Sequence, residues 1–287
     1  MRKNIFIFTQ EPKFFYKLNK RLKSLKLSYR VLSLGEKVPY YPSIILTTEK
    51  ETKNLPNFHN NKTTIISYKE NTDFEVYIFK ILKSYQVGNK ISKSLMFSID
   101  PGKKFGLIVF LDGYYLYSKT FYDKRTLVEN IKLNIEYIKE INLFCPKLII
   151  KIGRGVLNIS SFLVEEIFTT ISEKDLKVYL INEGKSSKIK LHRLINVLSK
   201  HEASALVLAL REGISVNREN FKRIISNINS NKISKEKLDI ENKDINLLNN
   251  NLDAMKEIFL KIVNNEISIR ESNALIKSRN LFNNLSH

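Results

Sequence analysis

The sequence predicts an α/β protein with two domains and a helical C-terminal tail. Short apolar runs of strand length alternate with amphipathic segments of helical spacing from residue 5 to residue 212. A polar stretch, Gly88-Asn89-Lys90, interrupts this alternation. The composition changes again after Val216, because residues 226–251 are rich in Asn, Ser, Lys and Asp and are typical of a flexible connector. We therefore expect domains at residues 1–90 and 91–216 and a tail at 217–287.

The first domain reads as a small basic α/β unit. The run Ile5-Phe6-Ile7-Phe8 is apolar throughout, which is typical of a strand buried on both faces of a parallel sheet. Amphipathic helical spacing separates such runs, which favours parallel strands joined by helices. Strands are expected at 5–8, 29–32, 43–46 and 63–66, and helices at 11–27 and 73–85.

The net charge of the chain indicates which kinds of molecule it binds. Lys and Arg number 48 against 29 Asp and Glu, a net charge of +19 and a sequence pI near 9.7. A protein this basic most often meets a polyanion, and nucleic acid is the commonest one. The alternative is a solubilising surface in a lysine-rich composition. The excess is densest in the first domain, with 17 basic and 7 acidic residues in 1–90.

Two further features of the sequence bear on the cellular compartment of the protein. Cys145 is the single cysteine, which excludes disulfides within the chain and cysteine-based zinc sites. No apolar run approaches the roughly 20 residues that a membrane-spanning helix needs. A reduced, cytoplasmic protein without membrane contact is the expectation.

The second domain is expected to form a mixed sheet with flanking helices. A strand ends at Asp100, and two more surround the tight turn Asp112-Gly113. A buried strand at 148–150 is closed by Gly153-Arg154-Gly155. Further elements complete the order: strands at 105–111, 113–121 and 177–181, and helices at 124–142, 156–172 and 200–212.

Asp100 is the most informative residue of this domain. It ends the apolar run that starts at Leu95, and Pro101-Gly102 follows as a turn. A strand that delivers one carboxylate to its end places that acid at a sheet edge, where cations or phosphates reach it. An ordinary hairpin explains the same residues, since Asp-Pro-Gly is good turn chemistry anywhere.

The combination of four segments resembles the ribonuclease H-like fold, in particular the branch of the RuvC Holliday-junction resolvases and their YqgF relatives. The resemblance covers about residues 95–215. The segments are Ser98-Ile99-Asp100-Pro101-Gly102, Ile149-Ile150-Lys151-Ile152-Gly153, Ile181-Asn182-Glu183-Gly184-Lys185 and His201-Glu202-Ala203-Ser204-Ala205.

This resemblance implies a divalent-metal-dependent nuclease that hydrolyses phosphodiester bonds in structured DNA or RNA. Asp100, Glu183 and Glu202 would hold Mg²⁺ or Mn²⁺, with His201 beside them. We expect Asp100 and Glu183 on adjacent strands, close enough to share one cation. The basic residues beside these positions would bind the nucleic acid: Lys103, Lys104, Arg154, Lys185 and Lys188.

The chain also departs from the RuvC pattern. The resolvases carry a glutamate at the end of the strand that corresponds to 148–152, where this chain has Lys151 and Gly153. Ser204 stands where a second acid is expected in the last helix. A middle acid supplied by Glu183 would fit the YqgF pattern. The alternative function is a non-catalytic nucleic-acid-binding protein that keeps the fold with a degenerate acid set.

Glu202 and the tail each have a second interpretation. Ser199-Lys200-His201-Glu202 is a capping-box pattern, so Glu202 could serve the helix start as well as a metal. In the tail, helices are expected at 252–263 and 267–284, with Met255, Ile258, Phe259 and Ile262 on one stripe. That stripe could cap the core, form a homodimer or bind another protein.

Overall fold

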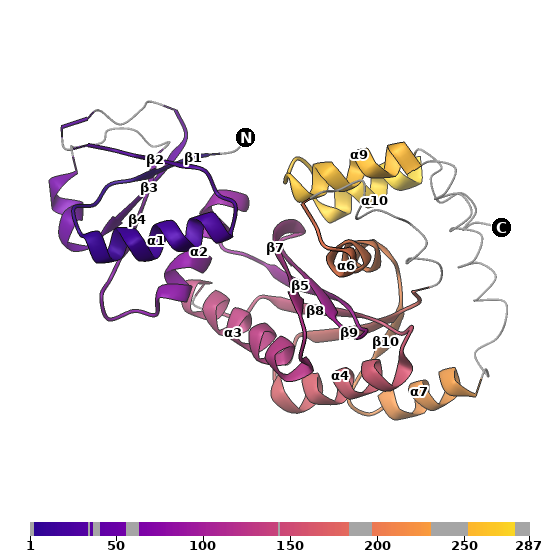
Figure 1. The fold of residues 1–287 in the computed structure, drawn as a ribbon. Coiled ribbons are helices and arrows are strands. Elements are labelled where there is room, and N and C mark those ends of the chain that lie inside the picture. The colour runs from indigo at the N-terminus through magenta and orange to yellow at the C-terminus, as the bar shows by residue number, and fades with distance from the viewer. Residues whose placement is uncertain are drawn as a thin grey trace. The chain divides into compact units, whose positions relative to one another are not determined.

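The computed structural model describes residues 3–33, 35–36, 41–55, 63–142, 144–183, 197–230 and 252–278. The chain divides into two compact units, Met1–Lys90 and Ile91–His287, which are called unit 1 and unit 2 below (Figure 1). Each unit has its own sheet and its own helices.

Unit 1 contains a four-stranded sheet in the order β2-β1-β3-β4, and every neighbouring pair is parallel. The central strand β3 is buried along its whole length. A parallel strand covered on both faces has this burial, which explains the apolar run Ile44-Ile45-Leu46. The parallel α/β unit expected from the sequence is confirmed. Its elements are β1 (Asn4–Ile7), α1 (Pro12–Ser24), β2 (Tyr29–Val31), β3 (Ser43–Thr48), η1 (Lys50–Asn54), β4 (Thr63–Tyr68) and α2 (Phe74–Gln86).

Unit 2 contains a six-stranded mixed sheet in the order β10-β9-β8-β5-β6-β7. Three strands, β5, β6 and β7, form an antiparallel meander, and β8 and β9 continue parallel to β5. The strands are β5 (Ser94–Asp100), β6 (Phe105–Leu111), β7 (Tyr114–Phe121), β8 (Lys147–Gly153), β9 (Leu176–Ile181) and β10 (Ile214–Val216). This is the strand order of a ribonuclease H-like fold, so the predicted fold class is confirmed.

The directions of these strands bring several strand ends to one edge of the sheet. β5, β7, β8 and β9 all run the same way, and their last residues, Asp100, Phe121, Gly153 and Ile181, therefore lie along one side of the sheet. We call this side the carboxyl edge of unit 2. The loop that enters β6 lies there too, because Gly106 pairs with Asp100.

Helix α6 (Lys200–Leu210) covers one face of this sheet, and α3 (Lys124–Asn142) and α4 (Leu157–Thr170) cover the other (Figure 1). The small residues of α6 let it lie close to the strands. The Ser98 hydroxyl on β5 donates to the Ala205 carbonyl at 2.7 Å, and both groups are buried. This bond fixes α6 along β5.

Lys151 forms hydrogen bonds with carbonyl groups at the C-terminal end of α6. It lies in β8, and its Nζ donates to the carbonyls of Ala209 and Arg211 at 2.6 and 2.7 Å. Burial lowers the pKa of Lys151 to about 8, against a smaller opposing effect of Glu212. The lysine that replaces an expected strand-end acid thus satisfies carbonyls at a helix C-terminus.

The C-terminal helices cap the core of unit 2. α9 (Leu252–Val263) and α10 (Ile269–Ser278) pack against each other, α10 contacts α6, and α9 contacts β7. The predicted stripe of Met255, Ile258, Phe259 and Ile262 is buried in one cluster with residues of α6. Because the chain itself covers this stripe, the structure gives no support to a homodimer or a protein partner through it.

Three elements were not expected from the sequence, η1 in unit 1 and two in unit 2. β10 is a three-residue strand that pairs antiparallel with β9, and α7 (Phe221–Asn229) follows it. The predicted connector at 226–251 was therefore wrong for its first residues, which continue α7. Its remainder, from 231 on, falls outside the described residues. Among the described helices, none is long and apolar enough to cross a membrane.

Candidate active site

Asp100 is a buried carboxylate at the carboxyl edge of unit 2. Only 9% of the residue is exposed. Burial raises the pKa of Asp100 to about 7, and the charge of Lys200 opposes this shift. At neutral pH, a nearby cation would shift the equilibrium toward the ionised carboxylate.

His201 reaches Asp100 from the first turn of α6. Its Nδ1 lies 3.4 Å from the Asp100 Oδ2. Gly106 permits this approach, because a Cβ there would lie 2.0 Å from the His201 carbonyl oxygen. Burial lowers the pKa of His201, and Lys200 and Lys104 lower it further. A neutral imidazole therefore faces Asp100 at pH 7.

Glu183 extends across the end of β8. A Cβ added at Gly153 would lie 2.2 Å from the Glu183 Oε1, and one at Gly155 would lie 2.1 Å from Oε2. The Gly155 N–H donates to Oε1 at 2.9 Å. The two glycines therefore leave the space that the Glu183 carboxylate fills. Burial raises the pKa of Glu183, and the charge of Asp100 raises it further, against the Gly155 bond and Arg211.

The expectation that Asp100 and Glu183 end adjacent strands was wrong. β8 lies between β5 and β9, so one strand separates the two acids in the sheet. Glu183 nevertheless interacts electrostatically with Asp100. Gly153, the last residue of the intervening strand, has no side chain and so leaves room for the Glu183 carboxylate.

Glu202 does not join these acids. Its Oε1 accepts from the Thr120 hydroxyl at 2.9 Å, and its Oε2 accepts from the Ser118 hydroxyl at 3.0 Å. With Ser199 it also forms the complete capping box that the sequence predicts. Both oxygens are therefore used to fasten the start of α6 to β7.

The three predicted metal ligands thus do not form one cluster. In the part of the chain that the structure describes, no group of three or more His, Cys, Asp and Glu side chains is placed to hold a metal ion. Mg²⁺ in proteins commonly has one or two carboxylate ligands and keeps several waters. Asp100, which is buried, and Glu183, which is half-buried, both have raised pKa values and are the two acids available for such a site.

Three of the predicted nucleic-acid residues lie at the same edge. Lys103 and Lys104 are exposed in the loop between β5 and β6, and Arg154 follows β8 and is half-buried. Lys185 and Lys188 fall outside the described residues. Lys200, which acts on Asp100, adds a further cation at the start of α6.

Sequence reasoning missed an aromatic part of this edge. Tyr122 follows β7 directly and is 73% exposed, and the Lys104 Nζ lies 4.8 Å from the centroid of its ring. Lys124, the first residue of α3, places its Nζ 3.5 Å from the centroid of the Phe162 ring. The run Tyr122-Asp123-Lys124-Arg125, placed between a strand and a helix, was the available signal.

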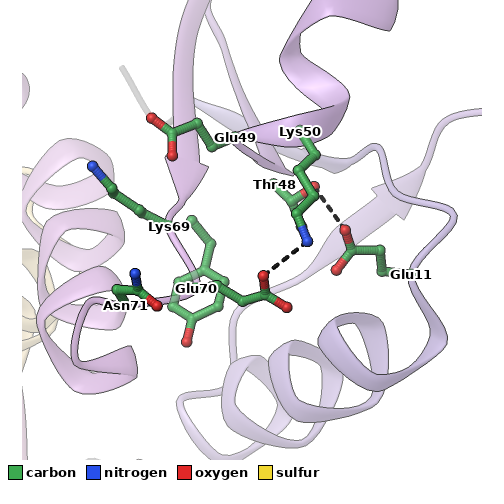
Figure 2. A pocket seen from close by; sticks show the side chains of 8 residues that line it. Glu11, Thr48, Glu49, Lys50, Lys69, Glu70 and Asn71 are labelled. Atoms are coloured by element: carbon green, nitrogen blue, oxygen red, sulfur yellow. Dashed lines mark hydrogen bonds and ion pairs between the residues drawn. The ribbon is translucent and has the colours of Figure 1, made fainter.

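Unit 1 has a pocket of its own at the end of its sheet. Figure 2 shows three acids around it, Glu11, Glu49 and Glu70, together with Lys50 and Lys69. The volume of the cavity is about 180 Å³. Lys50 pairs with Glu70 at 2.8 Å. Since three acids face two lysines, this pocket has no cationic excess for a phosphate.

Comparisons with known proteins give structural matches alone. No family model matches the chain, and no curated protein matches its sequence. An Argonaute of Marinitoga piezophila, in complex with a guide RNA and target DNA, matches with 14% identity and a TM-score of 0.26. The MID-PIWI domains of the N. crassa Argonaute QDE-2 match with 9% identity and a TM-score of 0.25.

Both matches cover 63% of this chain. The chain spans 39% of the M. piezophila protein and 73% of the QDE-2 domains. TM-scores this low carry no argument about function. The fold of unit 2 is therefore assigned from its own strand order.

Proposed function

We propose that unit 2 is a nucleic-acid-binding, divalent-metal-dependent nuclease in which Asp100 and Glu183 hold the ion. The observation on which this proposal rests is the position of Glu183. Its carboxylate fills the space that side chains at Gly153 and Gly155 would occupy. A carboxylate from the segment after β9 thereby stands at the end of β8, the position where RuvC-like enzymes carry their own acid. This arrangement supports a place in the RuvC and YqgF branch.

The electrostatics of the two acids support a cation. Both carboxylates have raised pKa values because they are buried, and each would be stabilised in its charged form by a bound positive ion. A divalent ion, when bound, stabilises charge on a phosphoryl oxygen and lowers the pKa of a bound water. His201 orients the Asp100 carboxylate and is neutral at pH 7, so it can accept a proton there.

The cations around the site support a polyanionic substrate. Lys103 and Lys104 are exposed beside Asp100, and the whole chain has a net charge of +19. Phosphate contacts from such residues hold nucleic acid without reading its sequence. The substrate class we propose is structured DNA or RNA.

A second candidate function is nucleic-acid binding without cleavage. One observation favours it: within the described ranges, no group of three or more His, Cys, Asp and Glu side chains is placed to hold a metal ion. The carboxylate of Glu202, the third acid of the expected set, accepts from three protein donors: the Ser199 N–H of the capping box and the hydroxyls of Ser118 and Thr120 on β7.

Cleavage assays on labelled junction, duplex and single-stranded DNA and RNA separate the two candidates. The nuclease proposal expects cutting that requires Mg²⁺ or Mn²⁺ and falls by roughly 100-fold or more in Asp100→Asn and in Glu183→Gln. Glu129→Gln, an exposed acid on α3, is the matched control and should cut like wild type. Binding without metal-dependent cutting by wild type would favour the second candidate. Cutting that is unchanged in Asp100→Asn would contradict the site.

A further inference from the structure

Tyr122 is an exposed ring held between two ordered elements. It follows the last residue of β7 and precedes Asp123, whose carboxylate accepts from the Thr126 N–H at 2.9 Å in the first turn of α3. At 73%, it is the most exposed large apolar or aromatic side chain among the residues that the structure describes. An exposed aromatic alone needs no explanation, but the surroundings of this one are unusual.

Lysines accompany the aromatic rings at this end of β7. Nζ atoms lie 4.8 Å from the Tyr122 centroid for Lys104 and 4.9 Å from the Phe121 centroid for Lys119. Lys124 stands over Phe162 at 3.5 Å. The three lysines come from the loop before β6, from β7 and from the start of α3. Phe121 is buried and Phe162 belongs to α4, so Tyr122 is the exposed ring at the end of β7.

Tyr122 and Lys104 lie near the proposed site. β6 is the one strand between β7 and β5, which ends at Asp100. Two strand spacings amount to roughly 10 Å. Lys104 belongs to the loop that connects Asp100 to β6, and its Nζ lies 4.8 Å from the centroid of the Tyr122 ring. The same short loop therefore carries a residue that contacts Tyr122 and begins at Asp100.

We propose that Tyr122 is a stacking platform for one base of a single-stranded nucleic-acid segment, and that Lys104 binds a neighbouring phosphate. The inference rests on the proposed function of unit 2 and specifies its substrate. Proteins that bind single strands combine cationic grooves with aromatic rings on which bases stack. Lys104 approaches the Tyr122 ring, and the high exposure of the residue leaves room for a base.

The exposed ring favours a single strand over a duplex. In a duplex each base is already stacked on its neighbours, and a protein reaches base edges and phosphates alone. Tyr122 could contact such a duplex but could not stack within it without opening it. We therefore expect an unpaired segment or a frayed end beside Asp100.

Fluorescence anisotropy in EDTA, where no metal-dependent cutting occurs, tests this directly. The probes are a short labelled DNA strand and the same strand annealed to its complement. Tyr122→Ala should weaken binding of the single strand by roughly 5- to 100-fold, the usual effect of losing one base stack. Tyr122→Phe should stay within about twofold of wild type because it keeps the ring. Tyr16→Ala is the matched control, since Tyr16 is 70% exposed on α1 of unit 1.

Salt titration separates stacking from charge. Tyr122→Ala should leave the slope of log affinity against log salt unchanged, whereas Lys104→Ala should lower it by roughly 0.7, the value for one phosphate contact on a single strand. Equal single-strand affinity of wild type and Tyr122→Ala would overturn the platform and leave the proposed function standing. Failure of wild type to bind either probe would overturn the proposed function itself.

Discussion

Glu51 of unit 1 and Asp100 of unit 2 occupy comparable places and have opposite electrostatics. Glu51 lies three residues beyond the end of β3, and Asp100 is the last residue of β5. The exposed fraction is 8% for Glu51 and 9% for Asp100. The pKa of Glu51 is nevertheless lowered, whereas that of Asp100 is raised to about 7.

Hydrogen-bond donors account for much of this difference. Burial alone would raise the pKa of Glu51, but bonds from the Gln10 N–H and from the hydroxyls of Thr9 and Thr48 outweigh it. The described partner of Asp100 is His201, whose Nδ1 lies 3.4 Å from the Asp100 Oδ2. A carboxylate with a full set of donors is a structural element of its loop. A buried carboxylate with few donors is suited to a bound cation.

The largest expected effect of this contrast is on the pH dependence of stability. The folded pKa of Asp100 is raised from 3.8 to about 7, so the folded state holds more protons than the unfolded state across that window. Stability from this group therefore falls as pH rises, by up to about 1.4 kcal/mol per pH unit. Asp100→Asn should remove that fall, as urea denaturation from pH 4 to pH 8 would show.

Glu51 should behave in the opposite sense. Its folded pKa is lowered from 4.5, so its contribution is complete above that value and is lost as pH falls through the lowered pKa. Identical pH profiles for wild type and Asp100→Asn between pH 4 and pH 7 would refute the contrast between the two acids.

A methyl group at Gly106 should separate His201 from Asp100. The added Cβ would meet the His201 carbonyl at 2.0 Å, a backbone contact that cannot rotate away. Gly106→Ala should therefore cost about 3 kcal/mol of unfolding free energy and reduce metal-dependent cleavage. Gly102→Ala is the control, because its Cβ would have an ordinary 3.4 Å contact with the Lys104 carbonyl oxygen.

Neutralising Glu51 should destabilise unit 1 without affecting the site of unit 2. Glu51→Gln removes the negative charge that strengthens the bonds from Thr9, Thr48 and Gln10, and it replaces one accepting oxygen by a donor, so the hydroxyls can no longer donate to that atom. We expect a loss of about 2 kcal/mol in denaturant unfolding. Glu70→Gln, which disrupts an exposed ion pair with Lys50, should change stability much less.

The smallest effect is expected at Glu202. Glu202→Gln weakens the capping box and the bonds to Ser118 and Thr120, which should cost about 1 kcal/mol. Metal binding and cleavage should persist in the folded variant. A complete loss of cleavage with unchanged stability would place Glu202 among the metal ligands after all.

The sequence predicted those features that depend on local pattern. The capping box at Ser199, the turn at Asp112-Gly113 and the strand that ends at Asp100 follow from turn and cap chemistry within a few residues. The fold class followed from the resemblance and is confirmed by the mixed six-stranded sheet with its flanking helices.

Features that depend on distant contacts could not be predicted. That Glu183 lies over Gly153 requires knowing that β8 separates β5 from β9. The role of Glu202 was ambiguous because its partners on β7, Ser118 and Thr120, are about 80 residues away. β10 was missed because three residues carry no periodicity.

Calorimetric titration with Mg²⁺ and with Mn²⁺ tests the central claim most directly, that Asp100 and Glu183 form a cation site at the carboxyl edge of unit 2. We predict uptake of one ion by wild type at pH 8, lost in Asp100→Asn and in Glu183→Gln and retained in Glu51→Gln. Wild type that takes up no ion, or uptake that survives in Asp100→Asn, would contradict it.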